Sequence, residues 1–303
     1  MTSTFGIIDI GSNSIRLSIY KVKGRNFSLL INEKKIIGLA GHSVNGHLLR
    51  EGVERASEAV KKFRRICGNF RVVSVFAFAT ASLRNVSNSA EAARAISDSA
   101  GIPVEIISGE SEAVYAFEGA RNQVPLGDGL LIDIGGGSTE LLCYKNGAPA
   151  EKSSIPMGSL NAFTGFVSGI VPVQTELVRM REAFSAYLDG VPWLKGFKTD
   201  EICGVGGTMR ASGKLHKLLT GMETDTKYYH YPARAFPLVY DRVAAQHDTG
   251  LLLQNMPERI HTIIPGLTLA SVIIERTEPK TIKLSQYGVR EGYLLSGLTA
   301  AGI

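Results

Sequence analysis

The sequence predicts two α/β domains whose mixed sheets face each other across a cleft. Two observations carry this prediction: a segment near the N-terminus recurs near the middle of the chain, and each copy is followed by alternating strand and helix patterns. The 303 residues are enough for two domains of ordinary size. The spacing of the two copies places these domains at residues 1–125 and 126–303.

The repeat is IIDIGSNSIRLSIYKVKG, which begins at residue 7, and LIDIGGGSTELLCYKNG, which begins at residue 131. Asp9 aligns with Asp133 and Arg16 with Glu140, at a constant offset of 124 (133 minus 9). Each copy is an apolar run, a short turn of Gly, Ser or Asn, and an alternating run, which is the pattern of a β-hairpin. A hairpin is therefore expected at the start of each domain.

Hydrophobic periodicity predicts the elements that follow each hairpin. In the first domain they are helices over 51–67, 91–100 and 110–122 and strands over 72–80 and 104–107. In the second domain they are helices over 174–188, 209–219, 267–276 and 290–298 and strands over 201–205 and 281–284. The segment 225–257, rich in Tyr, Pro and Arg, is expected to be a helix with flanking loops, and we assign it no function.

Composition excludes several classes of protein. With 44% hydrophobic and 20% charged residues the chain is typical of a globular protein, and it has no apolar run near the roughly 20 residues that span a bilayer, so we expect no membrane partner. The net charge of +5 mildly favours an anionic ligand. No Lys/Arg tract with interleaved aromatics is present, so we expect no nucleic-acid partner.

Cysteine usage indicates the compartment. Cys67, Cys143 and Cys203 are odd in number, far apart and in apolar surroundings, which is typical of reduced core cysteines. The N-terminus shows no export signal, so we expect a cytoplasmic protein. The six histidines are scattered without paired spacing, so they receive no metal role.

The two hairpin turns are candidate phosphate sites. Small residues leave several backbone amides pointing into one concavity, where larger side chains would obstruct a phosphate. A single such turn could equally be an ordinary turn, but two matching copies favour a site. The predicted phosphate-binding residues of the turns are Ser12, Asn13, Ser14, Gly135, Gly136, Gly137 and Ser138. Asp9 and Asp133 are hard oxygen ligands suited to a magnesium ion that bridges phosphates.

A third glycine-rich loop, GVGGTMRASGKL, begins at Gly204 between a predicted strand and a predicted helix. The amides of Gly206 and Gly207 together with the helix N-terminus would make an anion site, with Thr208 as the helix N-cap. The same pattern is also that of a tight strand-to-helix turn.

Three further residues are candidates for chemistry. Glu112 is predicted near the start of a helix, and its carboxylate could take a proton from an attacking water if that helix enters the cleft. Arg84 and Arg259 flank predicted elements, and a guanidinium fork neutralises phosphoryl oxygens well. From the sequence pattern alone, a solvated surface position is the favoured interpretation of each arginine.

Several motifs in order make the chain resemble a known family. They are DIGSNSIRL, ATASLRNVSN, IISGESEA, DIGGGSTEL, PMGSLNAF, GVGGT, RIHTIIPG and GVREG. Together they resemble the exopolyphosphatase and guanosine pentaphosphate phosphatase family, within the actin, sugar kinase and heat-shock chaperone ATPase fold. The resemblance spans essentially the whole chain, and DIGGGSTE contributes most to it.

The resemblance implies roles for the candidate residues. Glu112 would be the catalytic base, Arg84 and Arg259 would contact phosphate, and residues 135–138 and 206–208 would cradle it. Asp9, Asp133 and Glu140 would hold or orient Mg²⁺. The resemblance also implies a homodimer and places the last helix, about 289–300, back on the first domain. Ser111 stands where relatives often carry a second carboxylate, and the chain stops soon after GVREG, which suggests a preference for shorter substrates.

The predicted activity is that of an exopolyphosphatase, which releases terminal phosphate from inorganic polyphosphate by magnesium-assisted attack of water. Guanosine pentaphosphate (pppGpp) is the alternative substrate, because the loops would bind phosphates in either case. No residue pattern identifies a guanine pocket. A sugar kinase and a non-catalytic polyphosphate sensor are alternatives from other classes. Since Arg16 aligns with Glu140, we expect the metal mainly at the second turn and an electrostatic or cross-cleft contact at the first.

Overall fold

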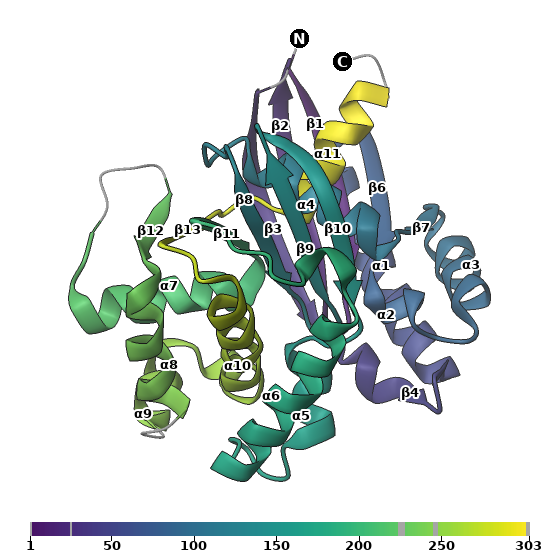
Figure 1. Ribbon diagram of the computed structural model, residues 1–303. Coiled ribbons are helices and arrows are strands. Elements are labelled where there is room, and N and C mark those ends of the chain that lie inside the picture. The colour runs from purple at the N-terminus through teal and green to yellow at the C-terminus, as the bar shows by residue number, and fades with distance from the viewer. Residues whose placement is uncertain (1, 25, 224–227, 245–247, 301–303) are drawn as a thin grey trace. The chain divides into compact units, whose positions relative to one another are not determined.

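The computed structural model describes residues 2–24, 26–223, 228–244 and 248–300 (Figure 1). The chain divides into two compact units. Unit 1 comprises Met1–Glu112 with Tyr293–Ile303, and unit 2 comprises Ala113–Gly292. The sequence-based domains, 1–125 and 126–303, have other limits and stay a prediction.

Unit 1 contains a mixed sheet with helices packed on it. The strands of unit 1 are β1 (Ser3–Ile10), β2 (Ser14–Lys23), β3 (Asn26–Ile36), β4 (Ser43–Val44), β5 (His47–Leu48), β6 (Ser74–Ala79) and β7 (Val104–Ile106). Its helices are η1 (Leu39–His42), α1 (Arg50–Asn69), α2 (Ala81–Arg84), α3 (Ser89–Ala100), the start of α4 (Gly109–Ala120) and the end of α11 (Val289–Ala300). The sheet order is β3-β2-β1-β6-β7. Amphipathic α1 buries Ala56, Val60 and Phe63 in the core of this unit.

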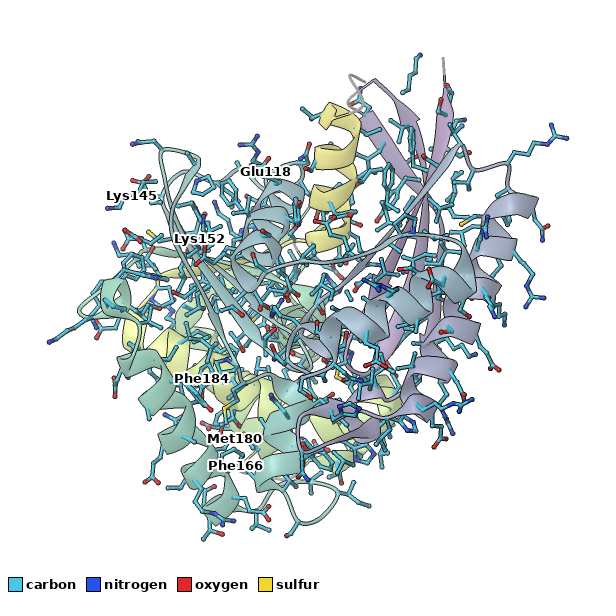
Figure 2. The ribbon with its side chains drawn as sticks, turned by 90° about the vertical axis from the view of Figure 1, so that its right-hand side faces the viewer. Glu118, Lys145, Lys152, Phe166, Met180 and Phe184 are labelled. Carbon is cyan, nitrogen blue, oxygen red and sulfur yellow. The ribbon has the colours of Figure 1, made fainter. Side chains whose placement is uncertain are left out.

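Unit 2 contains a second mixed sheet and more helices. Its strands are β8 (Gly129–Ile134), β9 (Thr139–Lys145), β10 (Ala148–Ile155), β11 (Glu201–Val205), β12 (Tyr229–Pro232) and β13 (Thr281–Leu284). Its helices, besides parts of α4 and α11, are α5 (Ser159–Phe166), α6 (Gln174–Asp189), η2 (Pro192–Leu194), α7 (Gly206–Thr220), η3 (Ala233–Ala235), α8 (Phe236–Ala244), α9 (Thr249–Asn255), η4 (Pro257–Arg259) and α10 (Ile260–Thr277). The sheet order is β10-β9-β8-β11-β13-β12. Phe166, Met180 and Phe184 of α5 and α6 gather in the core of this unit (Figure 2).

The two sheets repeat one topology, as the sequence repeat predicts. In each, three antiparallel strands precede two parallel ones, so β3-β2-β1-β6-β7 corresponds to β10-β9-β8-β11-β13, and β12 is an additional antiparallel edge strand. Asp9 lies opposite Arg16, and Asp133 lies opposite Glu140. The strand registers therefore confirm both hairpins and the alignment of the repeat.

Most predicted elements are confirmed, and strands 201–205 and 281–284 have the predicted limits. The helix predicted over 267–276 is longer, because α10 begins at Ile260 and includes Pro265. Nearly every side chain of α10 beyond its first turn is buried, so packing overrides the local effect of proline. Among the described helices, none is long and apolar enough to cross a membrane.

The prediction of one helix with flanking loops over 225–257 is wrong. Its described part contains β12, η3, α8, α9 and η4. The separate helices are short, and each contributes apolar side chains such as Phe236, Val239 and Leu252 to the core of unit 2. Residues 225–227 and 245–247 lie outside the described residues.

Candidate active site

The turn between β8 and β9 is held from one side by the start of α5. The Gly135 amide donates to the Ser138 carbonyl at 2.9 Å, which closes the turn. The glycine carbonyls accept hydrogen bonds from α5: Gly135 from the Ser159 amide (2.8 Å), Gly136 from the Leu160 amide (2.9 Å) and Gly137 from the Asn161 side chain (3.1 Å). The carbonyl side of this turn is therefore fully hydrogen-bonded.

The amide side of the same turn is available to a ligand. Helix α5 comes close because Gly158 precedes it, where a Cβ would lie 2.6 Å from the Gly135 carbonyl oxygen and the Ser138 amide nitrogen. Within the described residues, no acceptor takes a hydrogen bond from the Gly136 or Gly137 amide. Neighbouring free N–H groups in a turn of small residues form an anion-binding concavity. The turn can thus bind a phosphoryl oxygen, the role predicted for it.

The loop between β11 and α7 lies beside Asp133. Gly206 has φ +71°, and a Cβ there would lie 2.1 Å from Asp133 Oδ1, so glycine is required on both counts. The prediction that Thr208 is the N-cap is wrong, because α7 begins at Gly206 after Val205. The Thr208 hydroxyl instead donates to the Ile134 carbonyl at 3.1 Å and fixes the start of α7 to the end of β8.

Arg259 of η4 lies over this loop. A Cβ on Gly207 would lie 2.2 Å from Arg259 Nη2, so the guanidinium occupies the space that a side chain would need. Burial lowers the pKa of Arg259, and the charge of Glu258 partly opposes this shift. The structure thus brings together Gly206, Gly207 and Arg259, which lie far apart in the sequence. Helix-start amides beside a guanidinium are suited to phosphate.

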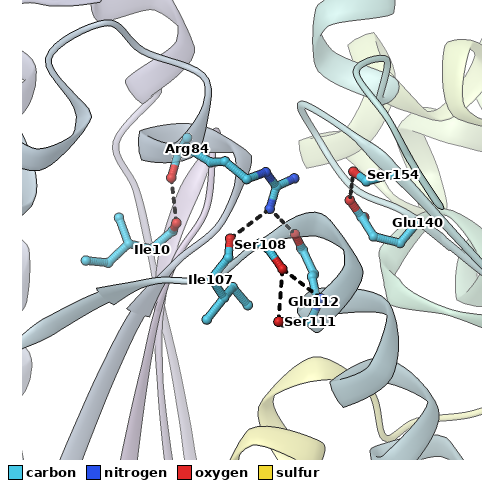
Figure 3. A network of polar contacts seen from close by, with 9 residues as sticks. Ile10, Arg84, Ile107, Ser108, Ser111, Glu112, Glu140 and Ser154 are labelled. Atoms are coloured by element: carbon cyan, nitrogen blue, oxygen red, sulfur yellow. Dashed lines mark hydrogen bonds and ion pairs between the residues drawn. The ribbon is translucent and has the colours of Figure 1, made fainter. Parts of the chain in front are cut away.

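Two carboxylates share one face of the β8–β9 hairpin. Asp133 is 9% exposed and Glu140 is fully buried, and directly opposite residues of antiparallel strands have neighbouring side chains. Glu140 Oε1 accepts a hydrogen bond from Ser154 Oγ at 2.8 Å (Figure 3). Two like charges in a buried place favour a bound cation.

The pair of Asp133 and Glu140 suits an Mg²⁺ ion that also binds water and substrate better than an ion whose ligands all come from the protein. Mg²⁺ usually binds through one or two carboxylates plus water and substrate phosphates. In the described part of the chain, no group of three or more His, Cys, Asp or Glu could hold a metal. Asp9, the third predicted ligand, belongs to unit 1 and lies opposite Arg16 rather than opposite a carboxylate.

The turn between β1 and β2 has the same closing bond as its copy in unit 2. The Gly11 amide donates to the Ser14 carbonyl at 3.1 Å. The start of η1 covers the carbonyls of this turn, because the Ala40 amide donates to the Ser12 carbonyl (3.0 Å) and the amide of Gly38, just before η1, donates to the Asn13 carbonyl (2.9 Å). The predicted residues of this turn are therefore held from the carbonyl side, as in unit 2.

Glu112 is fixed in unit 1 by the start of α4 and by Arg84 (Figure 3). Its carboxylate is 8% exposed, and its Oε2 accepts a hydrogen bond from Arg84 Nη1 at 2.8 Å. The same nitrogen also donates to the Ile107 carbonyl at 3.2 Å. Ser108 Oγ accepts from the Ser111 amide at 3.0 Å, which caps α4. Ser111, in place of a second carboxylate, thus belongs to the helix cap.

Sequence reasoning missed three residues at these positions. Ser159 and Asn161 were part of a motif but were not assigned to the site. Their signal was a helix-capping pattern after a strand: the Asn161 side chain accepts from the Gly158 amide at 2.6 Å. Arg210, near the start of α7, was missed as well. Aligning ATASLR with VGGTMR, which begins at Val205, would have identified it.

Comparison with known proteins gives the family. The model of the Ppx/GppA phosphatase family matches residues 18–301. A candidate exopolyphosphatase from Haemophilus influenzae is 26% identical over 295 residues, 95% of this chain and 90% of that protein. An exopolyphosphatase structure from Cytophaga hutchinsonii shares the fold, with a TM-score of 0.87 and 24% identity over 98% of both chains.

A Ppx/GppA family member from Aquifex aeolicus has a TM-score of 0.81 and 25% identity over 100% of both chains. The family match over residues 18–301 includes the β8–β9 turn, the α7 loop and Glu112, and it begins just after the β1–β2 turn. These matches confirm the resemblance carried by DIGGGSTE and the other motifs. The chain belongs to the Ppx/GppA phosphatase family and has its actin-like ATPase fold.

Proposed function

We propose that the protein is an exopolyphosphatase, a phosphoanhydride hydrolase that removes terminal phosphate from inorganic polyphosphate. The observation that carries the proposal is the Glu112 carboxylate, nearly buried and held by Arg84 at 2.8 Å. A fixed carboxylate of this kind can accept a proton from water. The names of the relatives and the free amides of Gly136 and Gly137 support a phosphorylated substrate.

The chain's residues divide the work of the proposed reaction. The amides of the β8–β9 turn and of the α7 start bind phosphoryl oxygens, and the Arg259 guanidinium offsets their charge. Arg84 orients Glu112, which accepts a proton as the water oxygen attacks the terminal phosphorus. The bridging P–O bond breaks, so orthophosphate and a chain one phosphate shorter leave. No covalent enzyme intermediate is needed.

We propose Mg²⁺ as the cofactor, held by Asp133 and Glu140, with Asp9 assigned to it by resemblance. The ion would neutralise charge on the transferred phosphoryl group. Glu140 is oriented by Ser154, and Asp133 by its close packing on Gly206. Removal of divalent ions by a chelator is expected to abolish turnover and to leave folding intact.

The test compares orthophosphate release from tripolyphosphate, long-chain polyphosphate and pppGpp under identical conditions. Fastest release from a polyphosphate is the expected result, with product formed from water alone and no sugar present. Release from pppGpp only would replace polyphosphate by the alternative substrate, since phosphate-binding loops accept either. Product that forms only when a sugar is added would identify a kinase instead. Binding without release, with Mg²⁺ present, would identify a sensor.

We further propose a cytoplasmic homodimer. The cysteines Cys67, Cys143 and Cys203 are free and buried, which supports a reducing compartment. Burial raises the pKa of Cys67 to about 11 and of Cys203 to about 12, so these thiols stay protonated and unreactive at neutral pH. The dimer rests on resemblance to the family. Light scattering after size-exclusion chromatography tests it, and a monomer mass at working concentration would remove it.

A further inference from the structure

We propose that Arg210 is a further phosphate-binding residue, which forms an anion site with Arg259 at the start of α7. The inference deepens the proposed function, because it assigns substrate-binding groups to unit 2. Arg210 lies on α7, five residues into the loop-helix segment that begins at Gly206. Its side chain is partly buried.

One hydroxyl contact recurs at equivalent positions of the two units. Ser82 Oγ donates to the Ile10 carbonyl at 2.6 Å, and Thr208 Oγ1 donates to the Ile134 carbonyl at 3.1 Å. Ile10 and Ile134 are equivalent positions of the repeat. The register of β11 on β8 is displaced by one residue from that of β6 on β1, so the hydroxyl contact rather than strand pairing sets the correspondence.

An arginine follows each hydroxyl by two residues. Arg84 follows Ser82, and Arg210 follows Thr208. Arg84 is the arginine that holds Glu112 in unit 1. Arg210 is therefore its structural counterpart in unit 2, at the start of the helix that succeeds the equivalent strand.

Arg210 and Arg259 both lie near the start of α7. Residues three apart on a helix share a face, so the Arg210 side chain lies on the face of Gly207. The Arg259 guanidinium occupies the space directly over Gly207. The start of α11 is also near, because a Cβ on Gly288 would lie 3.7 Å from Val205 Cβ. The positive charge of Arg259 acts on Arg210, so two guanidinium groups lie near one helix N-terminus, which already favours anions.

Arg210 and Arg259 have no hydrogen-bonded or ion-paired partner in the part of the chain that the structure describes, whereas Arg84 is ion-paired with Glu112. A carboxylate does lie near Arg210, at Glu291, but its Oε2 accepts the Gly288 amide at 2.8 Å. A partly buried cation without a hydrogen-bonded or ion-paired partner is costly unless an anion binds.

The electrostatics agree with this geometry. Burial lowers the pKa of Arg210 to about 10, and the positive charges of Arg290 and Arg259 act in the same direction, while Asp133 and Glu291 oppose it. The group nevertheless remains charged at neutral pH. Repulsion among like charges held around one helix start is relieved by a multiply charged anion.

The anion that fits is a phosphoryl group. Its oxygens can accept the fork of one arginine, the fork of another and the amides of a helix start at the same time. A carboxylate has only two oxygens for the same donors. Linked phosphates would bind more tightly than orthophosphate, since they offer more oxygens to two guanidinium groups.

The test measures binding without turnover. Tripolyphosphate and orthophosphate are titrated into the whole protein without divalent ions, by calorimetry and by the shift in Tm. For Arg210→Met we expect the dissociation constant for tripolyphosphate to rise about 10- to 100-fold, the effect of a lost charged hydrogen bond. Arg210→Lys, which keeps the charge but not the fork, should give a smaller rise. Arg179→Met, an exposed arginine of α6, is the matched control and should bind as the parent does.

The unliganded proteins give a second readout. Because Arg210 has no hydrogen-bonded or ion-paired partner among the described residues, Arg210→Met should have a Tm equal to or above that of the parent, while its Tm rises less with tripolyphosphate. A lower unliganded Tm with unchanged binding would show a purely structural role and overturn the inference. If Arg210→Met does not fold, unchanged binding by Arg210→Lys overturns it.

The two proposals can fail separately. Binding of tripolyphosphate that depends on Arg210, without phosphate release when Mg²⁺ is present, would leave this inference standing and remove the hydrolase. Phosphate release and tripolyphosphate binding that are both unchanged in Arg210→Met would remove this inference and leave the hydrolase standing.

Discussion

The hairpin turns of the two units have the same backbone and different charges. Both close with one amide-to-carbonyl hydrogen bond across the turn, and in both the next segment of chain bonds the turn's carbonyls. In unit 1 the aspartate lies opposite Arg16, whereas in unit 2 it lies opposite Glu140. The duplicated frame can hold phosphate twice, but only the second copy places two carboxylates together for a metal.

The arginines that follow the hydroxyl anchors differ in the same way. Arg84 is paired with Glu112 in unit 1, and its counterpart Arg210 has no hydrogen-bonded partner among the described residues of unit 2. One copy has thus become the holder of a proposed base, and the other a proposed anion site. The repeat thus places an arginine at equivalent positions of both units, and the presence or absence of an ion-pair partner decides its proposed role.

Among the variants that test this comparison of the two units, the largest effect is expected from Gly206→Ala. The alanine would need φ +71° and would place its Cβ 2.1 Å from Asp133 Oδ1, so the carboxylate must move. Displacement of a site group by about 1 Å costs on the order of 100-fold in turnover. Steady-state phosphate release measures it. The matched control is Gly221→Ala, with φ +67° and no atom within 4 Å of the new Cβ, which should lose stability but keep turnover.

A smaller effect is expected from Glu140→Gln. The variant removes one of two buried carboxylates on the hairpin face, so the Mg²⁺ concentration for half-maximal activity should rise about 10- to 100-fold. The aligned substitution in unit 1, Arg16→Gln, should leave the Mg²⁺ requirement as it is. If both variants shift the requirement equally, the metal does not belong mainly to the second turn.

The smallest effect tests the symmetry itself. Ser82→Ala and Thr208→Val each leave a buried carbonyl, Ile10 or Ile134, without its hydroxyl donor. Each should lower the free energy of unfolding by about 1 to 3 kcal/mol, measured by urea denaturation. Similar losses are expected, because the two contacts are equivalent. A loss in one unit only would argue against the equivalence of Arg84 and Arg210.

Local patterns explain why so much of the fold was predictable. The hairpins, the strands over 201–205 and 281–284 and most helices follow from periodicity and turn residues. The start of α10 could not be predicted, because Pro265 is tolerated only through packing within unit 2. The segment 225–257 has short helices whose limits depend on the core that they cover.

The site was predictable where a motif is contiguous. The turns and Glu112 were identified as candidates from their own residues or the family resemblance. What escaped was the relation between distant segments, such as Arg259 over Gly207. Thr208 was wrongly taken for an N-cap because its partner, the Ile134 carbonyl, lies 74 residues away.

The most direct test of the account is the turnover of Glu112→Gln on tripolyphosphate with saturating Mg²⁺, measured beside Glu110→Gln and tripolyphosphate binding. Loss of the base should lower turnover about 10²- to 10⁴-fold while binding is kept. The exposed Glu110, in the same helix turn, should be dispensable. Near-normal turnover by Glu112→Gln would contradict the assignment of the base to unit 1.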